Sequence, residues 1–179
     1  MPDSGSLRDH QIQLLVDRQE IHDVLMRYCH GVDRGDLALI LSAFHEDATD
    51  DHSGIEERAA DRFTRTVEQG KSMLTSHNLT NVLIQVDGDG AHSQAYFIAW
   101  HRFDHDGGKV DWLLSGRYLD RHERRAGIWR IAHRVVVYDC ERFDAVGPKP
   151  SGHAAGTALE HAMRGARSRA DQSYKVLHF

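Results

Sequence analysis

The stretch LTSHNLTNVLIQVDGDGAHSQAYFIAWHRF, residues 74–103, decides the fold class of this sequence. The residues on either side of its centre have the pattern of β-strands, and DGDG (87–90) supplies the glycines of a tight hairpin turn. We therefore predict a first hairpin with strands at 74–86 and 91–103.

The residues after this hairpin repeat its pattern. DHDGGK (104–109) and RRAGI (124–128) are two further turn signals, and each precedes a strand-like run, at 110–123 and at 129–139. Four long strands joined by tight turns predict an antiparallel meander.

The residues before the hairpin have helical spacing instead. Apolar residues recur every three or four positions over 8–33, 37–44 and 55–69, and a short extended piece around DATDDHS (47–53) separates the last two segments. Asp36 occupies the N-cap position before the second segment. Helices followed by one antiparallel sheet predict an α+β domain with the helices packed on one sheet face.

The end of the chain differs from the rest, so we divide the sequence into an α+β domain, 1–143, and a C-terminal extension, 144–179. The extension opens with DAVGPKPSGHAAG (144–156), a loop with two of the three prolines, and continues with a short helix and an extended end. Such a segment can fold over the domain, cover a pocket or reach a partner subunit. The sequence does not choose among these.

Composition narrows the classes of partner. A length of 179 residues suits one well-cored domain, and a formal net charge of -5 argues against nucleic acid or an anionic membrane surface as the partner. No apolar run approaches the roughly 20 residues of a membrane span. MPDSGSLRDHQ (1–11) lacks the apolar core of a signal peptide, so we expect a cytoplasmic protein. Cys29 and Cys140 lie far apart, and we expect both to be buried free thiols.

The sequence contains no motif that points to a metal or a cofactor. His101 and His105 have a zinc-like spacing but fall across a strand end and a turn, where residues four apart do not converge as on a helix. HEDATDDH (45–52) lacks the glycine and the spacing of a calcium loop. GxSxG, Walker and Rossmann patterns are missing from the sequence. We therefore expect chemistry that needs neither a metal nor a cofactor.

Several polar or aromatic residues occupy positions where apolar ones are expected. Asp33 ends the first predicted helix, where a carboxylate faces the negative end of the helix dipole, and His77 lies inside the first strand. The others are His52, Trp100, His101, Trp112, Arg117, Tyr118, Arg134 and Tyr138. A satisfied core or rim position explains any one of them equally well, so the hypothesis of a site depends on their combination.

The order of these elements resembles the nuclear-transport-factor-2-like superfamily, and most closely its SnoaL-like branch. The resemblance spans about Asp17 to Asp139. The matching stretches are YCHGVDRGD (28–36), SHNLTNVLIQVDGDGA (76–91), SGRYLDRHERRAGIWRIAHRVVV (115–137) and, in the tail, SRADQSY (168–174). The resemblance implies a cystatin-like fold, a cone-shaped α+β barrel with three helices on a curved four-stranded sheet, which hosts many chemistries.

Within this branch the chain is similar to lindane dehydrochlorinase, bile-acid dehydratase and scytalone dehydratase, which are lyases that use an Asp–His pair and no cofactor. The similarity implies that Asp33 and His77 form that pair, that Tyr28 is a pocket tyrosine, and that His52 replaces another tyrosine of the bile-acid enzyme. The late-strand arginine of that enzyme aligns with Tyr138. This departure leaves open which group supports the leaving atom.

These residues suggest a mechanism. His77 is the expected general base, and Asp33 would fix its tautomer and stabilise its imidazolium form. The candidates to protonate or polarise a leaving group are His52, Tyr28, Tyr138 and Arg134. The rings that suggest a pocket for a small apolar, aromatic or steroid-like substrate are Trp100, Trp112, Phe97 and Tyr96. A structural ion pair and a hydrophobic core are the alternative interpretations.

Three classes of function follow from this interpretation. The first is a lyase for an aromatic or polycyclic alcohol, with dehydration and carbon–carbon cleavage both open. The second is a double-bond isomerase of the ketosteroid type, and the third is a non-catalytic module like the small subunit of ring-hydroxylating dioxygenases. We also expect a homodimer or homotrimer, because both faces of VLIQV (82–86) and RVVVY (134–138) are apolar and the outer one needs a cover.

Overall fold

The structure, a computed structural model, describes residues 4–147 and 163–178. Its longest strands lie where the sequence predicts them: β3 (Leu74–Asp87), β4 (Gly90–His105), β5 (Gly108–Arg125) and β6 (Ile128–Ala145). They pair antiparallel in chain order, which confirms the predicted meander. The last two turns, Asp106–Gly107 and Ala126–Gly127, use positive φ at both residues, as tight type I′ turns require.

Two further strands enlarge the sheet, so the prediction of a four-stranded sheet is wrong. β1 (Phe44–His52) pairs with β6 in parallel, and β2 (Ile55–Arg58) pairs with β1 antiparallel. The six strands of the described sheet follow the order β2-β1-β6-β5-β4-β3. Ser53 and Gly54, both with positive φ, form the turn between β1 and β2. The sequence predicts residues 55–58 as part of the following helix, because Ile55 fits the apolar spacing of that helix.

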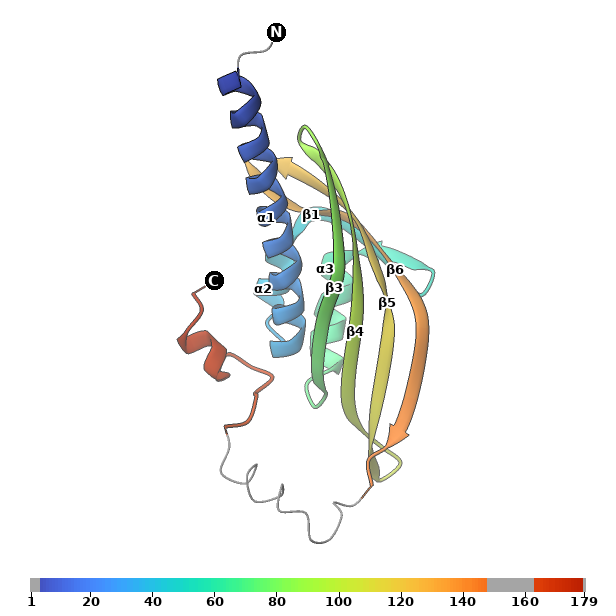
Figure 1. Cartoon of the computed structure of the whole chain (residues 1–179). Helices are drawn as coiled ribbons and strands as arrows, with labels where there is room; N and C mark the ends of the chain where they lie inside the picture. Colours follow the sequence, from blue (N-terminus) through green and yellow to red (C-terminus); the bar gives the residue numbers. More distant parts are fainter. Residues whose placement is uncertain (1–3, 148–162, 179) are drawn as a thin grey trace.

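Three helices precede the meander: α1 (Ser4–Arg34), α2 (Leu37–Ser42) and α3 (Ala59–Gln69). The Asp36 side chain accepts a hydrogen bond from the Leu39 amide, so the predicted N-cap of α2 is confirmed. α3 begins four residues later than the predicted helix, because residues 55–58 pair with β1 instead. Figure 1 shows the helices on the inner side of the curved sheet.

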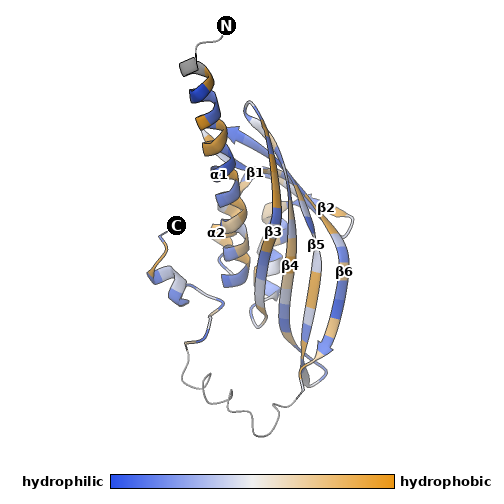
Figure 2. Ribbon diagram, in the orientation of Figure 1, coloured by the Kyte–Doolittle hydropathy of each residue, from blue (hydrophilic) through white to orange (hydrophobic). Residues whose placement is uncertain are grey.

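The main core lies between the helices and the inner face of the sheet. Its buried members include Val24, Tyr28, Ile40, Phe44, Phe63, Phe97, Tyr118 and Ile131. Buried and more exposed residues alternate along most of β4, so one side of this strand faces the helices. Figure 2 shows hydrophobic and hydrophilic residues interleaved along α1 and the strands, as expected of elements with one buried face. The molecule is therefore an α+β layer, with helices on one face of a curved sheet.

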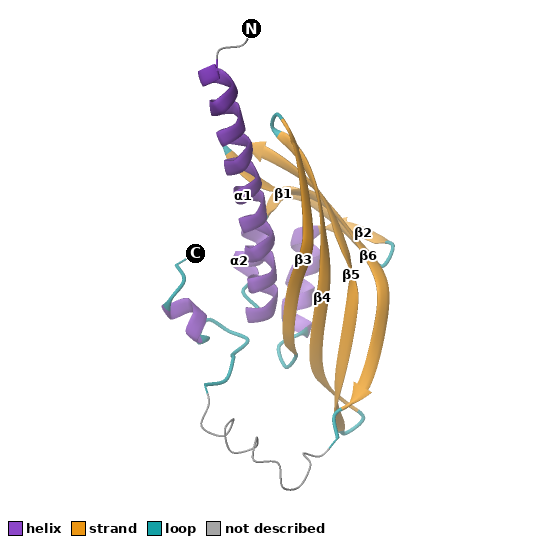
Figure 3. Cartoon of the chain, in the orientation of Figure 1, coloured by secondary structure: helices purple, strands orange, loops and turns teal. Residues whose placement is uncertain are grey.

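The C-terminal residues 163–178 fold back beside the end of α1 and contain a short 3-10 helix, η1 (Gln172–Lys175), which Figure 3 shows next to α1 and α2. Arg34 and Asp171 form an ion pair at 2.9 Å, and the Tyr174 hydroxyl donates to Asp36 at 2.8 Å. The tail therefore folds over the domain. Most of the loop expected at 144–156, and the start of the helix expected after it, lie outside the described residues.

The cysteines are free thiols, but only one is buried. Cys29 lies in the core, whereas Cys140 is exposed near the end of β6, because the strand continues past the covered part of the sheet. The expectation of two buried thiols is therefore wrong for Cys140. Within the described ranges, no helix has both the length and the apolar content to cross a membrane.

Candidate active site

A cavity of about 290 Å³ opens between the helices and the inner face of the sheet. Its described lining residues are Tyr28, Val32, His52, Arg62, Phe63, Thr66, Gln69, Gly70, Met73, Thr75, His77, Phe97, Ala99, His101, Trp112, Leu114, Tyr118, Val136, Tyr138 and Arg167. Small-molecule sites usually measure roughly 300 to 1,000 Å³, so this volume suits a compact ligand.

Asp33 and His77 meet at one wall of this cavity. The last turn of α1 carries Asp33, and β3 brings His77 past it. Asp33 Oδ1 accepts hydrogen bonds from His77 Nδ1 at 2.7 Å and from Thr75 Oγ1 at 2.9 Å, while Oδ2 accepts the backbone N–H of His77 at 2.9 Å. These donors satisfy a carboxylate that the helix dipole alone would disfavour.

These contacts determine where the protons lie. Burial raises the pKa of Asp33, but the hydrogen bonds and charge of His77, together with Thr75, outweigh burial and hold this pKa below its ordinary value. Because an ionised carboxylate can only accept, Nδ1 of His77 donates to Asp33. Neutral His77 therefore carries its proton on Nδ1 and keeps the lone pair of Nε2 available. The pair therefore has the arrangement of an oriented base.

His101, from β4, packs against the His77 ring with the ring centres 5.3 Å apart. Burial and the neighbouring His77 lower the pKa of His101 to about 4, although Asp33 acts in the opposite direction. His101 Nδ1 is buried and has no hydrogen-bond partner in the described part of the chain. A neutral His101 adds no permanent positive charge beside His77 at neutral pH.

A second Asp–His pair lies at another wall, formed by β1, α3 and β6. His52 Nδ1 is hydrogen-bonded to Oδ1 of Asp50, which is fully buried two residues earlier on β1. The same oxygen lies 3.1 Å from Nε of Arg62, on α3. The sequence suggested only His52 of this group, because neither Asp50 nor Arg62 belongs to a recognisable motif.

The structure brings some of the aromatic residues singled out in the sequence to the cavity and leaves others outside it. Tyr28, Phe97, Trp112 and Tyr138 line the cavity. Tyr96 and Trp100 do not, because they alternate along β4 with residues that face inward and therefore lie on the outer face of the sheet. There the guanidinium groups of arginines cover both rings, at 6.0 Å for Tyr96 and 5.0 Å for Trp100. Their prediction as substrate-binding residues is wrong.

Arg134 is also not a pocket residue. Its side chain is fully buried, and its Nε and Nη2 donate to the two carboxylate oxygens of Asp120, both at 2.7 Å. The guanidinium carbon lies 4.1 Å from the ring centres of Tyr28 and Tyr118. Arg134 thus supports two tyrosines of the cavity from behind, and the prediction that it touches substrate or leaving group is wrong.

Two arginines of the cavity wall were not predicted. Arg62 lies one helical turn before Thr66 on α3, and this spacing beside buried Phe63 was the available signal. Arg167 comes from the tail, more than 130 residues after the end of α1 that it contacts. No local pattern connects segments so far apart in sequence.

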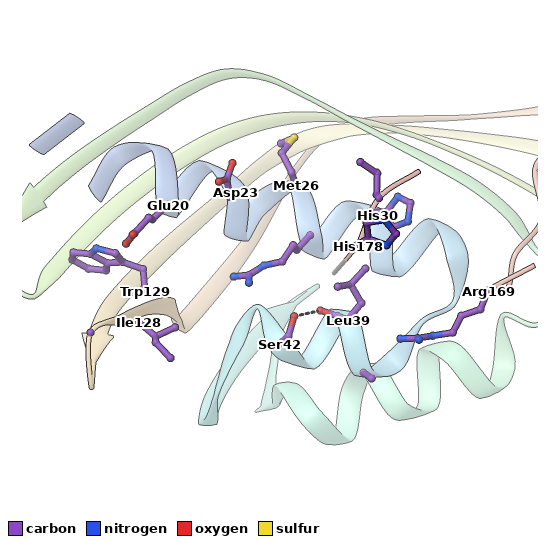
Figure 4. A pocket seen from close by; sticks show the side chains of 14 residues that line it. Glu20, Asp23, Met26, His30, Leu39, Ser42, Ile128, Trp129, Arg169 and His178 are labelled. Atoms are coloured by element: carbon purple, nitrogen blue, oxygen red, sulfur yellow. Dashed lines mark hydrogen bonds between the residues drawn. The ribbon is translucent and has the colours of Figure 1, made fainter. Parts of the chain in front are cut away.

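A larger depression of about 1000 Å³ lies along another face of α1 and reaches α2, β6 and the tail (Figure 4). Its acids, Glu20 and Asp23, are exposed, and the Asp23 side chain is 61% accessible. Solvent screens such carboxylates, so we take the inner cavity, where Asp33 orients His77, as the candidate site. In the described residues, no cluster of three or more His, Cys, Asp or Glu side chains is arranged to hold a metal ion.

Comparisons with known proteins agree with this architecture. A putative scytalone dehydratase from Novosphingobium aromaticivorans is 22% identical, with a TM-score of 0.66 over 80% of this chain and 99% of that one. A type 2 hexachlorocyclohexane dehydrochlorinase is 19% identical, with a TM-score of 0.66 over 79% and 99%. A variant of a protein of unknown function from Mycobacterium tuberculosis is 25% identical, with a TM-score of 0.60 over 71% and 74%.

A comparison with curated proteins finds no match. The family model of the SnoaL-like domain, in contrast, matches residues 13–135. These residues run from α1 into β6 and include Asp33, His52 and His77. The chain therefore belongs to the family of SnoaL-like domains.

Proposed function

We propose that this protein is a cofactor-independent lyase that eliminates a leaving group from a small aromatic molecule, with His77 as the base. The observation that carries the proposal is the contact of His77 Nδ1 with Asp33 at 2.7 Å, on the wall of a cavity lined by aromatic rings. A base oriented by a half-buried carboxylate is suited to removing a proton from carbon near neutral pH.

The proposed reaction moves only protons and electron pairs. Nε2 of His77 takes a proton from a carbon of the substrate, and the electrons of that C–H bond form the new double bond. The leaving group departs from the adjacent carbon with its bonding electrons. When the leaving group is hydroxide, it takes a proton from protonated His52 or from Tyr138, which line the same cavity.

Two further facts support an elimination. The structural neighbours include a putative dehydratase and a dehydrochlorinase, and both names describe eliminations. The cavity is lined by Phe63, Phe97 and Trp112, which can pack on the faces of a flat ring. Its volume of about 290 Å³ favours compact aromatic alcohols over a steroid.

The test is a screen of secondary aromatic alcohols and their halide analogues, followed by ultraviolet absorbance of the conjugated product and by mass spectrometry. Mass loss distinguishes elimination from isomerisation, which conserves mass. His77→Ala should abolish measurable turnover of any substrate found. His105→Ala is the matched control, because that side chain is 63% exposed at a turn, and it should leave the rate unchanged. Full activity of His77→Ala would contradict the proposal.

We also propose that the outer sheet face joins copies of the chain into a homodimer or homotrimer. Leu83, Tyr96 and Ile98 leave 65%, 38% and 47% of their surface exposed on neighbouring strands. Burial of such a patch is favourable in proportion to its apolar area. Sedimentation should show an oligomer that Ile98→Glu dissociates, and a wild-type monomer at micromolar concentration would contradict this assembly.

A further inference from the structure

The tail brings a guanidinium group to the cavity. Arg34 donates to the Ala166 carbonyl at 3.0 Å and to Asp171 at 2.9 Å, and Asp171 also accepts the Ala166 amide at 2.8 Å. These bonds hold the tail against the end of α1 on both sides of Arg167. Arg167 then lines the cavity together with His77.

One side of the Arg167 guanidinium is already bound. Its Nη1 donates to the Val32 carbonyl at 2.6 Å and to Thr75 Oγ1 at 2.9 Å, and Thr75 in turn donates to Asp33. Within the described residues, Nε and Nη2 make no hydrogen bond, and no carboxylate lies within 4.0 Å of this guanidinium. Arg167 is thus a half-buried cation with a free donor edge.

The free edge has the geometry that binds carboxylates elsewhere in this molecule. Arg134 and Arg102 each use Nε and Nη2 as a fork on the two oxygens of an aspartate, with distances of 2.6 to 2.7 Å. Such bidentate pairs are the strong form of a charge-assisted hydrogen bond.

A glycine keeps space beside this edge. A Cβ at Gly70 would lie 3.2 Å from Arg167 Nη2 and 2.8 Å from the Thr66 carbonyl. Gly70 has a φ of -87°, so its backbone conformation does not itself require glycine. Gly70 and Arg167 both line the cavity, so a larger side chain at position 70 would crowd Nη2 there.

The ionisable side chains that line the cavity are basic, apart from the tyrosines. Its described lining residues include arginines and histidines but no aspartate or glutamate. Asp33 and Asp50 stand behind His77 and His52, and Arg62 is paired with Asp50 and with Glu57 at 3.1 Å each. Arg167 is the arginine of this lining without an ion pair in the described residues.

We propose that Arg167 binds a carboxylate carried by the ligand, through Nε and Nη2, and so selects an aromatic carboxylic acid as the substrate class. This inference deepens the proposed function and uses its cavity as the substrate site. Arg167 lies outside the residues that match the family model, 13–135, so the selectivity belongs to the tail of this chain. The carboxylate would anchor the ring beside His77.

The experiment measures binding without turnover, by calorimetric titration of the full chain with 2-naphthoate and with its uncharged analogue 2-naphthamide. The wild type should prefer naphthoate. Arg167→Gln should weaken naphthoate roughly 10- to 100-fold, the value of a lost charge-assisted pair, and leave naphthamide unchanged. Arg167→Lys keeps the charge but not the fork, so its loss should be smaller. Arg164→Gln, at an exposed position of the same segment, is the matched control and should change neither affinity.

Three results would overturn the inference. They are a wild type that shows no preference for naphthoate, an Arg167→Gln variant that keeps the preference, and a variant that loses both ligands equally. The last result would mean that Arg167 only ties the tail to the Val32 carbonyl. If His77→Ala keeps its turnover while carboxylate selectivity holds, the lyase proposal fails and this inference stands. If selectivity is missing while turnover depends on His77, only this inference fails.

Discussion

Two Asp–His pairs stand at the wall of the cavity, with only their histidines in its lining, and their surroundings differ. Asp33 accepts from His77 and Thr75 only, and no arginine or lysine of the described residues lies within 4.0 Å of it. Asp50 Oδ1 contacts both His52 and Arg62, and its Oδ2 is buried without a described partner. The same two residue types are thus placed in different electrostatic settings.

This difference separates the roles that the two histidines can take. The charge of Asp33 is available to stabilise a positive His77, as a base requires after it takes a proton. The charge of Asp50 is shared with Arg62, and we propose that His52 takes the donor role beside the base His77. One cavity can therefore hold a proton acceptor and a proton donor built from the same pair of residues.

Among the variants that distinguish the two pairs, Asp33→Asn should have the largest effect. In Asp33→Asn the amide can still hold the His77 ring but cannot stabilise its positive charge, so kcat should fall about 10²- to 10⁴-fold. Steady-state kinetics with a substrate from the screen measures this loss, and near-ultraviolet circular dichroism checks the fold. Asp33→Asn with wild-type kcat would remove the distinction between the two pairs. A variant that fails to fold would instead assign Asp33 to a structural ion pair.

A smaller effect is expected at His52. His52→Gln removes the proton donor but leaves the base, so kcat should fall roughly 10- to 100-fold, toward the lower end of the range for acid–base catalysis. The loss should shrink for a halide analogue, because a halide departs without a proton. Comparison of alcohol and halide substrates tests this assignment. Equal losses on both would exclude His52 as the donor.

The stability of the protein should depend on pH through His101, which packs against His77. Because the pKa of His101 falls from 6.5 to about 4 in the folded protein, the unfolded chain takes up a proton first as the pH decreases. The free energy of unfolding should therefore decline between pH 6.5 and about 4. His101→Gln should reduce that decline but not remove it, because burial lowers the pKa of His122 to about 4 as well. Denaturant titrations at several pH values measure it. An unchanged pH dependence would contradict the assignment to His101.

The smallest effect is expected one helical turn from Asp33. Cys29 is 6% exposed, and burial raises the pKa of its thiol to about 12, so it acts as a small apolar side chain. Cys29→Ser should cost about 1 to 2 kcal/mol of stability, because it buries a hydroxyl, and should leave kcat unchanged. Thermal melting and kinetics on the same sample test both statements. A loss of rate without a loss of stability would contradict the assignment of Cys29 to a purely structural role.

The parts of this molecule that follow from local sequence were predictable. The glycine-containing turns and the apolar periods locate the meander and α1, and the position of Asp33 at a helix end made it conspicuous. β1 and β2 were not predicted as strands, because β1 is polar and its parallel pairing with β6 joins residues about 85 positions apart. Long-range pairing of this kind leaves no periodic trace in the sequence.

The arginines near the site also show that contacts between distant segments cannot be read from the sequence. Arg134 looked functional as a charge within an apolar strand, but its partner Asp120 lies directly across the β5–β6 ladder, so the charge is satisfied there. Arg167 was not singled out in the sequence, and only the fold brings it to the cavity. Burial and pairing in three dimensions decide which of these charges is free to bind a ligand.

The most direct test of the central claim is a double-mutant cycle on Asp33 and His77, with kcat measured for the wild type, Asp33→Asn, His77→Ala and the double variant. If the two residues act as one base, the double variant should be no slower than His77→Ala, because Asp33 has nothing left to stabilise. Losses that multiply in the double variant would contradict this account, since they would mean that Asp33 and His77 act independently.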